Sequence, residues 1–221
     1  HGYRSVERNP HHILGRETCL VPVVWPKNGW PVVNGNGTVT DDMTCETLPL
    51  KPFSEGQTRI EFNEEELGYE WNYIQVPDDS NYSLKERKGY LRLKGSDVTI
   101  KEKISFAVIE DRTPTFVGRR LQDLYFTATT SMLFDPENEN EEAGIALVNN
   151  GSCMRMVVEK SGNERYVVVK LDFDGITYLS KKKVINNSGP VILRINGEKS
   201  TLTFSCSPGN DTFENIETVN S

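Results

Sequence analysis

The chain has 221 residues, of which 36% are hydrophobic and 9% aromatic, enough to bury the core of one large domain or two small ones. Its formal net charge is −7, which argues against a nucleic-acid partner, because phosphate-binding surfaces are clustered and basic. No apolar run approaches the roughly 18 residues of a membrane-spanning helix, so no membrane partner is expected.

The N-terminal part contains two short apolar segments separated by a turn. They cover residues 20–25 and 29–34. Residues 34–56 are interrupted by Gly and Pro and show little periodicity, which indicates a linker laid over a surface. We therefore expect a domain boundary within residues 36–56.

From residue 58 onward, short segments rich in β-branched and aromatic residues alternate with clusters of turn residues, and no helix of ordinary length is predicted. We expect strands over residues 90–94, 124–134, 143–148, 153–159 and 165–173. Only turn clusters separate the last three, which predicts a meander of adjacent antiparallel strands. The basic run Lys181-Lys182-Lys183 is expected at a solvated strand edge or turn.

The C-terminal part predicts a hairpin. Apolar residues occupy every second position over residues 191–195 and again over residues 202–206. The pair Asn196-Gly197 lies between these segments and predicts the turn. Short strands with regularly spaced turns favour an all-β fold, a two-sheet antiparallel β-sandwich, over a barrel or an α/β fold.

Cysteine and histidine spacing predicts no metal site. The four cysteines are scattered without a C-x-x-C pair, so we expect free thiols and no disulfide. His11 and His12 have no acidic or Cys partner close in sequence and are assigned to a loop. The acidic runs at 64–66 and 137–142 are expected in solvated loops, and no motif supports a structural calcium ion.

The N-terminal motif points to a known family. Gly15-Arg16-Glu17-Thr18, an apolar run to Trp25, and Gly29-Trp30-Pro31-Val32-Val33 follow one another. This arrangement resembles the close of the catalytic β-propeller in β-xylosidases and α-L-arabinofuranosidases of glycoside hydrolase family 43.

Four later motifs extend the resemblance in the order found in the family. Phe62-Asn63, Leu67 and the segment 71–77 are similar to the start of its C-terminal sandwich, with Gln75 where Arg is common. The segment 82–93 is similar to the pattern that follows, with Lys88 in place of Pro. Arg119-Arg120-Leu121-Gln122 and Glu142-Ala143-Gly144-Ile145 are similar to its next two strands. The resemblance covers residues 1 to about 205.

The resemblance implies a domain organisation. Residues 1–36 would be the terminal strands of the catalytic β-propeller, residues 37–56 a linker, and residues 57–221 a concanavalin-like or jelly-roll-like β-sandwich. The family's closing strand motif is not found before Ser221, so the last strand is expected to be missing or divergent. Because the chain opens at His1, we expect a piece excised from a longer enzyme.

Family resemblance also implies where the chemistry lies. The family hydrolyses glycosides with inversion, using acidic residues of the first propeller blades, so no catalytic residue is expected in this chain. His1-Gly2-Tyr3-Arg4-Ser5 resembles the propeller strand whose arginine lines the glycone subsite, which implies that Arg4 binds substrate. A guanidinium there can hold a sugar hydroxyl and bias the pKa of a carboxylate. The alternative is an ordinary surface arginine.

Leu124 is the second substrate-binding candidate. In the xylosidases a loop after the Arg-Arg motif places an aromatic ring at the mouth of the active site, and Leu124 is the matching position. Leucine cannot stack on a sugar, and Tyr125 or Phe126 would replace it only after a register shift, which for one residue reverses the face. The alternative is that Leu124 and Phe126 are core residues of a strand.

Three functions follow from these observations. The first is an accessory sandwich that shapes the active-site mouth and stabilises the propeller of an enzyme cleaving xylosidic or arabinofuranosidic bonds in hemicellulose. Its partners would be that propeller and a xylo-oligosaccharide or arabinoxylan substrate, with no cofactor, and a secreted or periplasmic location is favoured by a small margin. The second is a carbohydrate-binding or lectin-like module that binds xylan through exposed aromatics, and the third a purely structural domain. The aromatic candidates are Trp71, Tyr73, Tyr82 and Tyr90.

Overall fold

The computed structural model describes residues 20–39, 44–52, 56–103, 112–149, 151–173, 175–186, 189–209 and 212–220. These residues belong to two units, which divide between Ile60 and Glu61.

The first unit contains one hairpin. β1 (Val23–Val24) pairs antiparallel with β2 (Val32–Val33), and the helical turn α1 (Asn34–Gly37) follows directly. None of the residues described between 20 and 60 is buried. The assignment of this hairpin to a propeller blade, with a linker over 37–56, stays a prediction.

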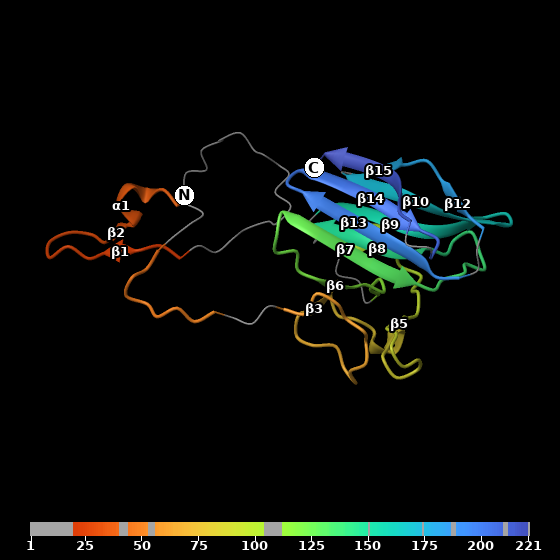
Figure 1. Ribbon diagram of the computed structural model, residues 1–221, viewed down its shortest axis with the longest axis horizontal. Helices are drawn as coiled ribbons and strands as arrows, with labels where there is room; N and C mark the ends of the chain where they lie inside the picture. The colour runs from red at the N-terminus through yellow and green to blue at the C-terminus, as the bar shows by residue number, and fades with distance from the viewer. Residues whose placement is uncertain are drawn as a thin grey trace. The chain divides into compact units, whose positions relative to one another are not determined.

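Residues 61–103 and 112–119 contribute two small antiparallel sheets to the second unit (Figure 1). β3 (Trp71–Tyr73) pairs with β6 (Val117–Arg119), and β4 (Tyr82–Ser83) pairs with β5 (Arg92–Leu93). A 3-10 turn spans Asp79–Asn81, and the short helix α2 spans Ile100–Lys103. The strand expected over 90–94 is therefore only two residues long.

A five-stranded antiparallel sheet follows, with the order β11-β10-β9-β8 and with β12 also paired to β10. Consecutive strands are neighbours from β8 to β11, which confirms the predicted meander. The basic run lies in the loop before β12 and at its first residue, on the edge of the sheet, as expected. The strands are β8 (Ala143–Asn149), β9 (Ser152–Ser161), β10 (Glu164–Phe173), β11 (Ile176–Leu179) and β12 (Lys183–Ile185).

The second large sheet has four antiparallel strands in the order β15-β14-β13-β7. β7 was expected from the run 124–134, and it pairs along its whole length with β13. The strands are β7 (Tyr125–Met132), β13 (Val191–Glu198), β14 (Thr201–Ser207) and β15 (Glu214–Asn220).

The core lies between the two large sheets, which face each other in Figure 1. Met156 and Val167 of the five-stranded sheet pack in one cluster with Leu193, Ile195 and Phe204 of the four-stranded sheet, and all five are fully buried. Burial alternates along β13, as a strand with one face on the core requires. The all-β, two-sheet sandwich is therefore confirmed.

The predicted hairpin turn is wrong, although its two strands are right. Asn196 and Gly197 lie inside β13, and the chain reverses at Lys199 and Ser200, where Lys199 has a φ of 57°. A Cβ on Gly197 would overlap the ring of Phe126 on β7. The glycine therefore provides room for a neighbouring side chain and does not form the turn.

Three cysteines lie in the described part of the chain, and all three are free, as predicted. Cys153 and Cys206 are buried, and burial raises the pKa of each thiol to about 11. Both thiols are therefore neutral at physiological pH and act as small apolar side chains. Cys19 lies outside the described residues.

Candidate functional site

The two substrate-binding candidates have different outcomes. Arg4 lies outside the described residues, so its role stays a prediction. Leu124 lies immediately before β7, at the end of the four-stranded sheet next to the β13–β14 turn. Its side chain is 40% exposed, and its carbonyl accepts a hydrogen bond of 3.0 Å from the backbone N–H of Lys199.

The two residues after Leu124 point to opposite faces of the sheet. Tyr125 is 63% exposed and lies opposite Glu198, whereas Phe126 packs against the core and lies opposite Gly197. Phe126 thus packs on the core, as the alternative interpretation expected, whereas Leu124, which the same interpretation also placed in the core, is exposed. Leu124 and Tyr125 are exposed to solvent, as are Gln122 and Asp123 before them.

The four aromatics proposed for a binding module are engaged within the domain. The ring of Trp71 packs against Phe62 with centroids 6.0 Å apart, and Tyr73 meets Tyr82 edge to face at 5.2 Å. The Tyr82 hydroxyl accepts from the N–H of Phe116 at 3.0 Å and donates to its carbonyl at 3.1 Å.

Tyr90, the fourth ring, also has an internal partner. The guanidinium of Arg87 lies 3.8 Å from the centre of this ring. All four rings therefore have partners within the domain, while Tyr73 and Tyr90 keep 36% and 40% of their surfaces exposed.

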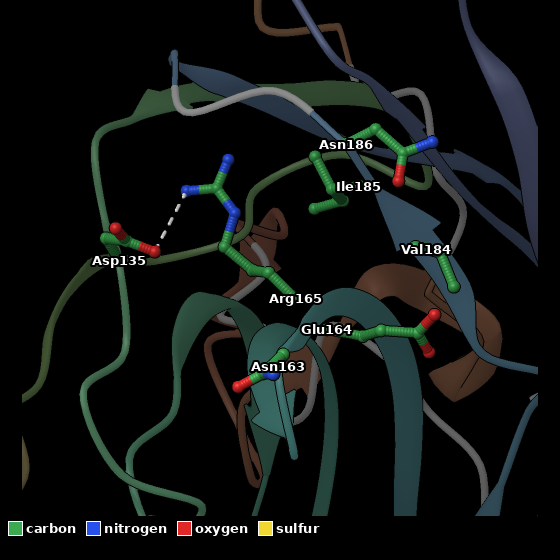
Figure 2. Close-up of a pocket in the computed structure, with 7 residues that line it drawn as sticks. All are labelled: Asp135, Asn163, Glu164, Arg165, Val184, Ile185 and Asn186. Carbon is green, nitrogen blue, oxygen red and sulfur yellow. Dashed lines mark ion pairs between the residues drawn. The ribbon is translucent and has the colours of Figure 1, made fainter.

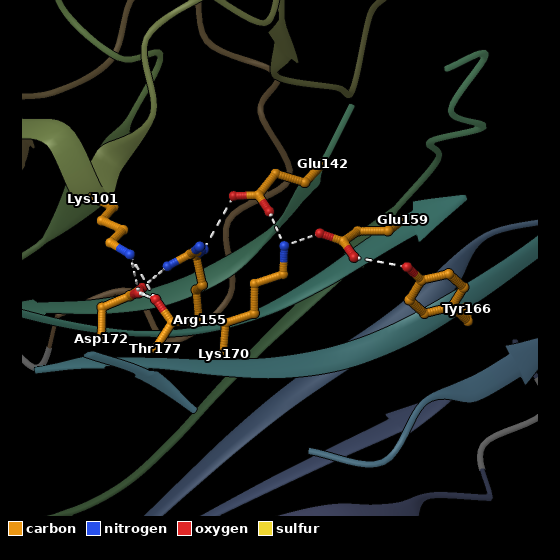
Figure 3. A network of polar contacts seen from close by, with 8 residues as sticks. All are labelled: Lys101, Glu142, Arg155, Glu159, Tyr166, Lys170, Asp172 and Thr177. Atoms are coloured by element: carbon orange, nitrogen blue, oxygen red, sulfur yellow. Dashed lines mark hydrogen bonds and ion pairs between the residues drawn. The ribbon is translucent and has the colours of Figure 1, made fainter. Parts of the chain in front are cut away.

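A network of charged side chains lies on the face of the five-stranded sheet that points away from the core (Figure 3). Glu142 bridges two cations, with Arg155 Nε 3.1 Å from its Oε1 and Lys170 Nζ 2.7 Å from its Oε2. Arg155 also pairs with Asp172, and Lys170 also pairs with Glu159. Each carboxylate of the network therefore has a cationic neighbour.

The network continues to the helix α2 at one end. Lys101 Nζ donates to Thr177 Oγ1 at 2.7 Å, and Thr177 donates to Asp172 Oδ1 at 2.6 Å (Figure 3). At the other end the Tyr166 hydroxyl donates to Glu159 at 3.0 Å. These contacts attach α2 to the outer face of the sheet.

The network has the electrostatics of a structural cluster. Burial raises the pKa of Glu142, but the hydrogen bond from Lys170 and the charge of Arg155 outweigh it, and the net pKa lies below the ordinary 4.5. Glycoside hydrolysis needs a general acid whose pKa is raised. Glu142 is ionised at neutral pH and does not fit that role.

A hollow around Arg165 is lined by residues at the start of β10, by Val184 and Ile185 of β12, and by the polar loop residues Asp135, Asn163 and Asn186 (Figure 2). The Arg165 guanidinium donates to the carbonyl of Phe134 at 2.8 Å and of Gly189 at 3.4 Å, and it lies 3.9 Å from the carboxylate of Asp135. Arg165 therefore joins the loops after β7 and before β13 to β10.

Within the described ranges, no group of three or more His, Cys, Asp or Glu side chains is arranged to hold a metal ion. No helix in the described part of the chain is long and apolar enough to cross a membrane.

Comparison with known protein families shows to which family the chain belongs. The family model for the β-xylosidase C-terminal concanavalin A-like domain of glycoside hydrolase family 43 matches residues 59–221. The chain belongs to this family. The matched range includes all of the second unit that the structure describes, and the match confirms the family resemblance of the sequence motifs.

Curated relatives of this family 43 chain include known glycosidases. A non-reducing end α-L-arabinofuranosidase of Bacteroides ovatus is 32% identical over 92% of this chain and 37% of its own length. A xylan 1,3-β-xylosidase of a Vibrio species is 27% identical over 100% of this chain and 40% of its own length. The chain therefore spans about two-fifths of the length of these relatives.

Solved structures show the same fold. The GH43 protein BlXynB of Bacillus licheniformis matches 94% of this chain with a TM-score of 0.81 and 26% identity. The GH43B protein of the Bacteroides ovatus xyloglucan PUL matches 90% of it with a TM-score of 0.79 and 27% identity. These matches cover 39% and 38% of the two solved chains.

Sequence reasoning missed the charged network of the family 43 domain. Its signal lies in single charged residues inside apolar strands, such as Arg155 between Met154 and Met156, or Lys170 between Val169 and Leu171. Charges at such positions need partners, because an unpaired buried charge is costly. Which residues pair depends on the strand register, which a single sequence does not contain.

Proposed function

We propose that this family 43 domain is the accessory C-terminal part of a glycoside hydrolase, and that the catalytic carboxylates lie upstream in a β-propeller. The substrates would be hemicellulose fragments with xylosidic or arabinofuranosidic bonds. The domain would stabilise the propeller and shape the mouth of its active site.

The exposed hairpin of the first unit carries this proposal. Trp25 is 77% exposed and Trp30 is 89% exposed, and the valines of β1 and β2 are exposed as well. A two-stranded hairpin is at best marginally stable in water, and exposed apolar patches mark interaction sites. We propose that this hairpin packs into the propeller that would precede it, as the greater length of the relatives supports.

The edge at Leu124 supports the second part of the proposal. It presents two accessible side chains, Leu124 and Tyr125, on a backbone held by β13 and by the turn at Lys199. A rigid edge of this kind is suited to form one wall of a neighbouring pocket. Leu124 would supply an apolar contact where a xylosidase supplies an aromatic ring.

The substrate class comes from the relatives. Because both an arabinofuranosidase and xylosidases are among them, we propose either bond type and assign no preference between the two sugars.

The test compares two lengths of the same gene product. A protein extended upstream of His1 to include the propeller should hydrolyse an aryl β-D-xyloside or an aryl α-L-arabinofuranoside, whereas residues 1–221 should hydrolyse neither. Retained hydrolysis by residues 1–221, or an inactive extended protein that is folded, would contradict the proposal.

A further inference from the structure

We infer that the β13–β14 turn positions Leu124, and that Gly197 and Lys199 are positioning residues for the mouth of the active site. The structural part of this inference stands on contacts within the sandwich. Its functional part rests on the proposed role of Leu124 in the longer enzyme.

The first contact is made by the backbone of Lys199. Its N–H donates to the Leu124 carbonyl at 3.0 Å, beyond the last ladder pair of β7 and β13, which joins Tyr125 and Glu198. Lys199 adopts a φ of 57°, a left-handed conformation that is unfavourable for a residue with a Cβ. A strained turn persists where surrounding contacts determine it, and here they include the hydrogen bond to Leu124.

The second contact joins Gly197 of β13 to the ring of Phe126 on β7. Phe126 lies opposite Gly197 in the ladder, and its ring occupies the space that a side chain at 197 would need. The same ring packs against the core cluster. Phe126 is therefore held both by the core and by the bare backbone of β13.

Leu124 is held through the backbone on which it lies, by these two contacts with β13 and with the turn after it. Its carbonyl is held by Lys199, and the residue two positions later is held by Gly197, while its own side chain remains 40% exposed. A side chain presented from a fixed backbone loses little conformational entropy when it meets a ligand. The turn therefore determines where the Leu124 side chain lies relative to a bound substrate.

The activity test uses the upstream-extended protein and four single variants. Gly197→Ala forces the Phe126 ring to move. Phe126→Leu removes the ring and adds no Cβ at position 197, so it replaces Gly197→Ala as the test if that variant does not fold. Lys199→Gly removes the strain of a positive φ but keeps the N–H that donates to the Leu124 carbonyl, so it is the conservative variant at this position. Gly162→Ala strains a turn of the other sheet, where φ is also 57° and no atom lies within 4 Å of the new Cβ.

Gly197→Ala and Phe126→Leu should raise KM for an oligosaccharide about three- to tenfold with kcat nearly unchanged, because an apolar contact contributes uniform binding of modest size. Gly162→Ala should leave KM within about twofold. Lys199→Gly should raise KM, but by less than Gly197→Ala does, because the N–H is kept while glycine lets the turn adopt other conformations. When each of the first two changes is combined with Leu124→Ala, its effect on KM should disappear, because coupled residues are not additive. The inference would be overturned if the KM effects of Gly197→Ala or Phe126→Leu simply added to that of Leu124→Ala. It would also be overturned if Gly162→Ala changed KM as much as Gly197→Ala does.

A second measurement separates this inference from the proposed function. In residues 1–221, the methyl NMR signals of Leu124 should shift in Gly197→Ala but not in Gly162→Ala. Unmoved Leu124 signals would overturn the positioning of Leu124 whatever the enzyme does. Shifted signals together with an unchanged KM in Leu124→Ala would instead contradict the proposed role of Leu124.

Discussion

Arg155 and Asp172 lie on the central strands β9 and β10 of the five-stranded sheet, with 7% and 3% of their surfaces exposed. Removing such charges from water costs several kcal/mol per ion unless an opposite charge and hydrogen bonds compensate. Asp172 receives both, from Arg155 and from the Thr177 hydroxyl. Asp172 also lies 3.7 Å from the Lys101 ammonium, which connects the buried pair to α2.

Glu142 is the residue of this network with the clearest dependence on pH. Its pKa is lowered in the folded state, so its contribution to stability is complete above the ordinary pKa of 4.5 and is lost as pH falls through the lower folded value. We expect Glu142→Gln to reduce the free energy of unfolding by about 1–3 kcal/mol at pH 7, because Arg155 and Lys170 each lose a partner.

Urea unfolding between pH 7 and pH 3 would measure this effect. The difference between Glu142→Gln and the parent should shrink as the pH falls below 4.5. The exposed Glu65→Gln is the matched control and should stay within about 0.5 kcal/mol of the parent. A difference that is constant over this range would show that Glu142 acts through packing and not through its charge.

At the scale of single elements, β11 and β12 together form one interrupted edge strand beside β10. Ser180 fills the interruption: its N–H donates to the Val169 carbonyl at 2.9 Å, and its hydroxyl accepts from the Val169 N–H at 2.9 Å. The edge is thus kept in two short pieces without an unpaired buried amide. Such an interruption, with the lysines beside it, discourages pairing with other chains.

Ser180→Ala should destabilise the sandwich through this interruption. The change leaves the buried Val169 N–H without its acceptor, which should cost about 1–3 kcal/mol. Ser180→Thr keeps the hydroxyl and should recover most of the loss. Chemical denaturation would compare the three proteins, and equal stability of the alanine and threonine variants would contradict the assigned role of the hydroxyl.

Elements could be predicted from the sequence where one local pattern determines them. The meander β8–β10 followed from apolar runs bounded by turn residues, and the alternation in β13 and β14 gave their buried faces. The position of the turn could not be predicted, because Gly197 makes room for the ring of Phe126, a residue about seventy positions earlier in the chain. The same limit applies to Glu142, Arg155 and Asp172, whose pairing arises only when three strands align.

At the scale of the whole molecule, the two units differ in how they meet the cost of folding. The sandwich unit buries a continuous cluster between its sheets, whereas the first unit buries none of its described residues. Conformational entropy opposes folding at every ordered residue, so a hairpin without a core needs surface from elsewhere. Its exposed tryptophans are the side chains best able to supply that burial.

We therefore expect Trp30→Ala to have a small effect on stability in residues 1–221 and a large one in the upstream-extended protein. In residues 1–221 the change should alter the unfolding free energy by no more than about 0.5 kcal/mol, because the side chain is exposed. In the upstream-extended protein it should cost about 3–5 kcal/mol, the range for removing a buried aromatic side chain. Calorimetry on the two proteins would measure this difference. Phe204→Ala, which removes a core side chain, is the control and should lower the stability of both proteins. A Trp30→Ala effect as small in the longer protein as in residues 1–221 would mean that the hairpin does not pack into a propeller, and the proposed function would lose its main support.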